Sequence, residues 1–94
     1  MDINGGAEVT LRLPDAIELF SDLEEVVVSL DRIRSRIAFA DASPQILVDY
    51  MVDRELFQRL ARARGLVGDA VEAVIGAARL EEIAEEGYVY PGDR

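Results

Sequence analysis

The sequence predicts a small, mainly α-helical domain of three helices with a short N-terminal β-strand. Apolar residues recur every three or four positions through most of residues 15–86, which is typical of amphipathic helices. Each helical stretch is bounded by residues that commonly begin or end helices. The 94 residues are half hydrophobic and contain no internal repeat, so we expect a single domain over residues 1–94.

The N-terminal strand is expected at about residues 8–13, after a flexible lead at residues 1–6. Val9, Leu11 and Leu13 alternate with polar residues, which is the period of a half-buried strand. Pro14 ends it because proline has no amide hydrogen to donate to a sheet. We interpret it as a structural edge that pairs with the "YVY" segment near the C-terminus or with its copy in a second subunit.

The first helix is expected at about residues 15–40, with Asp15 as its cap. Its apolar stripe is expected to face the core and consists of Ile17, Phe20, Leu23, Val27, Leu30, Ile33 and Ile37. The opposite face carries Glu18, Asp22, Glu25, Arg32 and Arg36. The segment "EEVVVSL" contains three consecutive valines, so a strand at residues 25–30 stays an alternative, and so does a break near residues 29–35.

Two more helices are expected, at about residues 44–64 and 68–86. Ser43 and Pro44 form a start signal for the first of them, and Gly65 stands where helices often end. The second begins near Gly68 and is stopped by Gly87. The tail at residues 87–94 is interpreted either as a short strand or as an irregular end.

The composition argues against an enzyme. The chain has no histidine, cysteine, lysine or tryptophan, which removes the commonest acid–base group, the thiol nucleophile and the usual zinc ligands. Carboxylate pairs at helical spacing, such as Asp49 and Asp53, are interpreted as a solvated acidic face. We expect no catalytic residue, no cofactor and no metal.

Charge and hydropathy limit the partners. A formal charge of −9 repels phosphate backbones and therefore disfavours nucleic acid as the main partner. No apolar run approaches the roughly 18 residues of a membrane span, and the first residues lack the pattern of a secretory signal. The sequence thus predicts a cytoplasmic protein that does not bind membranes.

The predicted function is a non-catalytic protein–protein interaction module, a small acidic adaptor or inhibitor that self-associates. Helices that are apolar on more than one side need partners, and a homo-oligomer or another protein would supply them. The proposed contact surface is the acidic end of the last helix with the tail, formed by Glu81, Glu82, Glu85, Glu86, Tyr88 and Tyr90. Rigid aromatic side chains are favoured in interfaces.

An alternative function comes from a local resemblance. The stretch "VTLRLPD" followed by a helix resembles the start of ribbon-helix-helix proteins, which are dimeric DNA-binding regulators and antitoxins. The resemblance implies that two such strands pair across a two-fold axis and insert Glu8, Thr10 and Arg12 into the major groove, with Thr10 and Arg12 as the DNA-binding residues. The sequence departs from that family because "EEVVVSLDRIRSRIAFA" contains no glycine-bearing turn between two helices.

Overall fold

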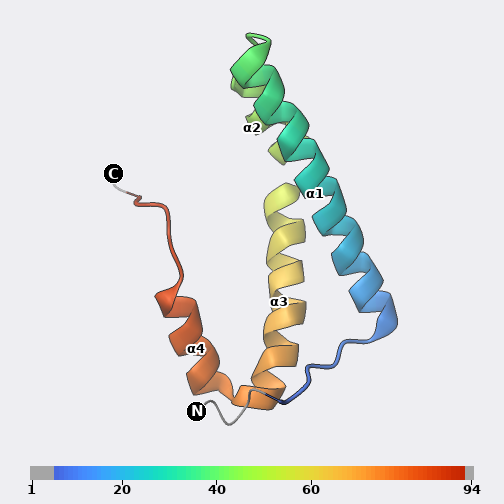
Figure 1. Cartoon of the computed structure of the whole chain (residues 1–94), viewed down its shortest axis with the longest axis vertical. Coiled ribbons are helices and arrows are strands. Elements are labelled where there is room, and N and C mark those ends of the chain that lie inside the picture. Colours follow the sequence, from blue (N-terminus) through green and yellow to red (C-terminus); the bar gives the residue numbers. More distant parts are fainter. Residues whose placement is uncertain (1–5, 93–94) are drawn as a thin grey trace.

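The structure is a computed structural model that describes residues 6–92, and this part of the chain forms four helices (Figure 1). They are α1 (Leu13–Phe39), α2 (Gln45–Asp53), α3 (Leu56–Ile75) and α4 (Ala77–Glu86). α2 and α3 run back along α1 in the opposite direction, and α4 reverses again beside the end of α3. The predicted mainly helical class is confirmed, although with four helices in place of three.

The predicted N-terminal strand is wrong. Residues 7–12 are irregular, no strand occurs in residues 6–92, and Leu13 already belongs to α1. A single alternating segment gains ladder hydrogen bonds only if another strand lies beside it, and the "YVY" segment, residues 88–90, is irregular too. Pro14 fits the first turn of a helix, where a missing amide hydrogen costs nothing. The rest of the expected lead and tail, at residues 1–5 and 93–94, lies outside the described residues.

The first helix is confirmed with nearly the predicted bounds. α1 continues through the three valines of residues 26–28, so neither the alternative strand nor the break near residues 29–35 is present. Its last turn ends as the Ala40 N–H donates to the Arg36 carbonyl oxygen. Asp41 then takes a positive φ of 57°, which turns the chain back towards α2.

The predicted boundary between the second and third helices is wrong. α3 passes without interruption through Gly65 and Gly68, and the chain breaks at Glu55 and at Gly76. A glycine inside a helix costs only about 1 kcal/mol relative to alanine, so helix packing can override it. A Cβ at Gly68 would lie 3.9 Å from Leu80 Cδ2, an ordinary van der Waals contact, so α4 packs beside α3 here without requiring a glycine.

The break between α3 and α4 requires a glycine at position 76. Gly76 has φ 88° and ψ 158°, a backbone conformation that residues with a Cβ rarely adopt. Its N–H donates to the Glu72 carbonyl oxygen at 2.8 Å and its own carbonyl accepts from Leu80 at 3.1 Å. Gly76 therefore joins two helices with no intervening loop.

The molecule is elongated and has a very small core. Only Val26, Leu56 and Ala63 are buried among the described residues. The radius of gyration is 16.9 Å, against about 12 Å for a compact domain of this length. The accessible surface is 7608 Å², against about 5,400 Å² for a folded monomer of this mass. The chain thus leaves exposed much of the surface that a folded monomer usually buries.

Candidate interaction surfaces

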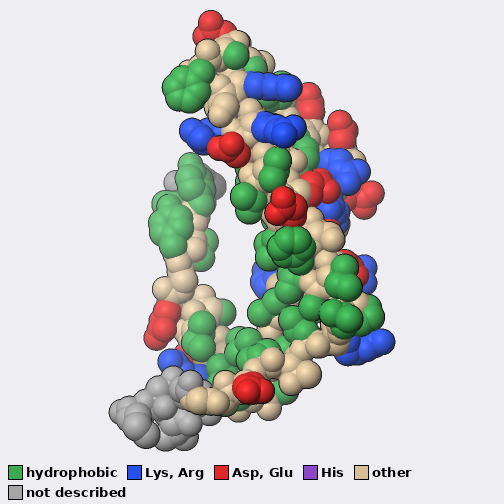
Figure 2. All heavy atoms as spheres, turned by 45° about the vertical axis from the view of Figure 1, so that its right-hand side comes forward, with side chains coloured by type: hydrophobic (Ala, Val, Ile, Leu, Met, Phe, Trp, Pro, Cys, Tyr) green, Lys and Arg blue, Asp and Glu red, His purple; other side chains and the backbone are tan. Residues whose placement is uncertain are grey.

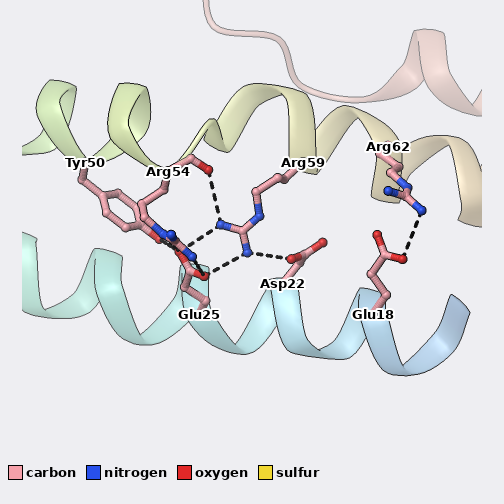
Figure 3. A network of polar contacts seen from close by, with 7 residues as sticks. All are labelled: Glu18, Asp22, Glu25, Tyr50, Arg54, Arg59 and Arg62. Carbon is pink, nitrogen blue, oxygen red and sulfur yellow. Dashed lines mark hydrogen bonds and ion pairs between the residues drawn. The ribbon is translucent and has the colours of Figure 1, made fainter. Parts of the chain in front are cut away.

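α1 is held against α2 and α3 by hydrogen bonds that converge on Glu25 (Figure 3). Tyr50 Oη donates to this carboxylate at 3.0 Å, and Arg54 donates from Nε and Nη2, both at 3.1 Å. Arg59 donates from Nη1 at 3.0 Å and from Nη2 at 2.9 Å. One side chain of α1 therefore contacts the end of α2, the break after it and the first turn of α3.

Two further ion pairs extend this contact along α1. Arg59 Nη2 lies 2.6 Å from Asp22 Oδ1, and Arg62 Nη2 lies 3.2 Å from Glu18 Oε1. Glu18, Asp22 and Glu25 are three or four residues apart and so share one face of α1. We call the whole set the polar seam; its members are Glu18, Asp22, Glu25, Tyr50, Arg54, Arg59 and Arg62.

The seam shifts the pKa values of Glu25, Arg54 and Arg59 in the direction that keeps these groups ionised. Hydrogen bonds from Arg54 and then Arg59 hold the pKa of Glu25 well below its ordinary value of 4.5. The pKa of Arg59 is raised by its hydrogen bonds to Glu25 and Asp22, and that of Arg54 by its hydrogen bond to Glu25. Because these charges neutralise one another, the seam is suited to joining helices rather than to moving protons.

The seam leaves the apolar side of α1 uncovered. Leu13, Ile17, Phe20, Leu23 and Val27 are 71%, 56%, 66%, 47% and 66% exposed, and we call these five residues the α1 stripe. Their spacing places them on the side of α1 away from the seam. The expectation that this part of the helix faces the core is wrong, because the charged face makes the contact with α3 instead. Figure 2 shows hydrophobic side chains lying uncovered over the lower half of the helical body.

The polar seam was not predicted, although the sequence contains a signal for it. The acids of the seam recur at positions 18, 22 and 25, and arginines recur at positions 59 and 62. Complementary charges at matching helical spacing on two segments indicate that those faces meet. From the sequence alone, Glu18, Asp22 and Glu25 are expected on the face of the first helix that lies opposite the apolar stripe, and no partner is assigned to them.

An apolar groove continues from the α1 stripe towards the C-terminal end of α1. Leu30, Ile33, Ile37 and Leu47 line it together with Ala38 and the stem of Arg34, and its volume is about 370 Å³. Leu30 joins the stripe to the groove, since it is three residues beyond Val27. A second apolar groove, of about 280 Å³, lies over the junction of α2 and α3 and is lined by Met51, Leu56, Phe57, Leu60, Ala61 and Arg64.

The predicted contact surface at the C-terminal end is exposed. Glu81, Glu82, Glu85 and Glu86 all lie on α4 with accessible side chains, and Arg79 pairs with Glu82 at 3.2 Å. Tyr88 and Tyr90 are 84% and 81% exposed on a tail that extends away from the other helices. These six residues form the α4–tail surface. Its contact with a partner stays a prediction.

The residues predicted to read DNA under the alternative function lie in the irregular segment before α1. Thr10 and Arg12 are exposed. Arg12 is the N-cap residue of α1, and its carbonyl oxygen accepts a hydrogen bond from the Ala16 N–H at 2.9 Å. The ribbon that the resemblance implies requires paired strands, and residues 7–12 are not a strand.

The remaining observations do not point to a particular ligand. Within residues 6–92, no group of three or more His, Cys, Asp or Glu side chains is arranged to hold a metal ion. No helix in this part of the chain combines the length and the apolarity that crossing a membrane requires. Comparison with protein-family models, curated proteins and solved structures finds no match.

Proposed function

We propose that this chain is a non-catalytic protein-interaction module, a small acidic adaptor or inhibitor. One observation carries the proposal: three of the residues between 6 and 92 are buried, whereas large apolar side chains on every helix in that range remain exposed. Isolated apolar residues on a surface are ordinary, but a continuous apolar stripe marks a contact surface.

The energetics support an obligatory partner. Fully burying one large aliphatic or aromatic side chain contributes about 1.5–3 kcal/mol. The five members of the α1 stripe alone could therefore contribute as much as the whole stability of an ordinary domain, about 5–15 kcal/mol. A chain that leaves this surface in water gains most of its stability when another protein covers it.

The α4–tail surface supplies the acidic part of the proposal. Four glutamates on ten residues of α4 create a local negative field, and the exposed rings of Tyr88 and Tyr90 are suitable anchors beside it. A basic protein surface is the complementary partner. Binding there should weaken as salt screens the charges.

The test compares two variants of equal charge in a pull-down from lysate of the source cells. One variant changes Glu81, Glu82, Glu85 and Glu86 to glutamine. The control neutralises four other exposed acids, Glu8, Asp53, Asp69 and Glu72, so that both variants lose the same charge. We expect a defined protein to be retained by the wild type and the control, and to be released from the wild type by 0.5–1 M salt.

If the glutamine variant fails to retain that protein and the control retains it, the result supports the α4–tail surface as the contact. If both variants retain it equally at every salt concentration, this surface is not the contact. If the wild type is a stable monomer and retains no protein, the proposed function is wrong.

A further inference from the structure

We propose that the α1 stripe is the interface with a second copy of this chain, formed by two α1 helices that pack antiparallel about a two-fold axis near Val27. The inference rests on the proposed function and names the partner for this one surface. It leaves the α4–tail surface of each copy free for another protein.

The amount of excess surface fits a permanent dimer. The accessible surface exceeds that of a compact monomer of this mass by about 2,200 Å². Obligate homodimers bury about 1,000–2,500 Å² on each subunit, so this whole-chain excess, of which the α1 stripe is one part, is large enough to include such an interface. A partner needed for stability must be present whenever the chain is made. A second copy meets that condition, and two-fold dimers are the commonest oligomers.

The spacing of the stripe fits helix-to-helix pairing. Leu13, Phe20 and Val27 are seven residues apart, and Leu23, Leu30 and Ile37 form a second series with the same spacing. Two apolar series offset by three residues are the pattern with which one helix packs against another helix in a coiled coil. α1 has 27 residues and no break, so it provides a long, straight surface for this packing.

The surface is also complementary to itself. In a two-fold dimer each copy must carry both a protruding group and the hollow that receives it. Phe20 protrudes, with 66% of its side chain exposed, and the groove around Arg34 is hollow and apolar. These two positions are fourteen residues, or about 21 Å, apart along α1. Val27 lies midway, so an axis there places Phe20 of each copy opposite the groove of the other.

Because the chain contains no cysteine, a single introduced cysteine can form a disulfide only with the same residue of a second copy. Val27→Cys, Leu13→Cys and Phe57→Cys are prepared separately and oxidised at low protein concentration. In the proposed dimer only Val27 lies beside its own copy, within the Cα separation of about 7 Å that a disulfide needs. Leu13 is about 21 Å from the axis along α1. We therefore expect a covalent dimer from Val27→Cys and no covalent dimer from the other two variants.

A mixed experiment tests the register. Phe20→Cys and Arg34→Cys should each give no covalent dimer when oxidised alone, and should form a covalent heterodimer when the two are mixed before oxidation. In this heterodimer one of the two Phe20–groove contacts stays unchanged, because Phe20 of the Arg34→Cys copy faces the intact groove of the other copy. Circular dichroism of each variant checks that it keeps the helical content of the wild type.

Three results would overturn the inference. Covalent dimers from both Leu13→Cys and Val27→Cys would indicate a parallel pair. A covalent dimer from Phe57→Cys alone would place the interface on the α2–α3 face. The absence of any cross-link in a chain with the mass of a monomer would exclude the dimer, while the α4 variants would still decide the proposed function independently.

Discussion

Both terminal nitrogens of Arg59 donate to the two carboxylate oxygens of Glu25, at 3.0 and 2.9 Å, across the contact between α1 and α3. Bidentate pairing of this kind fixes direction as well as distance. It determines which face of α1 turns towards α3, and it thereby leaves the apolar face outside. The exposed stripe is thus a consequence of the seam.

The first prediction concerns Glu25. Glu25→Gln leaves three donor side chains, those of Tyr50, Arg54 and Arg59, facing a neutral amide. We therefore expect the melting temperature at pH 7 to fall by about 5 °C, the change that a loss of about 1 kcal/mol produces in a domain of this size. Asp31→Asn is the matched control, because its pair with Arg34 is mostly exposed, and it should change the melting temperature by less than about 2 °C. Equal effects of the two substitutions would contradict a structural role for the seam.

The second prediction follows from the lowered pKa of Glu25. A carboxylate whose pKa is lower in the folded state stabilises the fold above its unfolded pKa, here about 4.5, and loses that contribution as the pH falls towards the folded value. The difference in melting temperature between wild type and Glu25→Gln should stay constant from pH 8 to about pH 5 and shrink below about pH 4.5. A difference that grows on acidification would contradict this sign.

The third prediction separates core from surface at two adjacent residues. Leu56 is 4% exposed and Phe57 is 73% exposed. Leu56→Ala should lower the free energy of unfolding by about 2–4 kcal/mol. Phe57→Ala should lower it by less than about 1 kcal/mol in chemical denaturation. Similar losses at both positions would mean that Phe57 is also covered in solution, by a partner on the α2–α3 face.

The fourth prediction contrasts two glycines. Gly76→Ala places a Cβ at φ 88° and should destabilise the chain by about 1–2 kcal/mol. Gly65 lies inside α3 with no atom within 4 Å of the position of a Cβ, so Gly65→Ala should stabilise by up to about 1 kcal/mol. If Gly65→Ala destabilised the chain and Gly76→Ala did not, the helix would end at Gly65, as expected from the sequence.

Much of the helical content could be predicted from the sequence, because a helix of 27 residues carries a long periodic signal. The breaks could not. Glu55 adopts a left-handed backbone conformation at φ 50° without any local residue that favours it, whereas the two glycines that normally indicate an end lie inside α3. The contacts that Arg54 and Arg59 make with Glu25 connect segments about 30 residues apart, and a local pattern does not reveal them.

The orientation of α1 was predicted incorrectly for a related reason. An apolar stripe normally faces the core of its own chain, and that rule assigned Phe20 and Val27 to the interior. In this molecule the paired charges of Asp22 and Arg59 occupy the inner face of α1, so the apolar residues lie on the outside of the chain. The α4–tail surface could be proposed from composition and is exposed as expected, but its partner is untested.

The central claim is that the α1 stripe pairs two copies of the chain, and molar mass in solution tests it most directly. Light scattering after size exclusion should give twice the chain mass of 10.4 kDa, at two protein concentrations tenfold apart. Because each copy carries a charge of −9, the dimer should be tighter at 1 M than at 0.05 M salt. Phe20→Glu should halve the mass and Phe57→Glu should leave it unchanged. A folded wild-type monomer at both concentrations, or a dimer that Phe20→Glu does not disturb, would contradict the account.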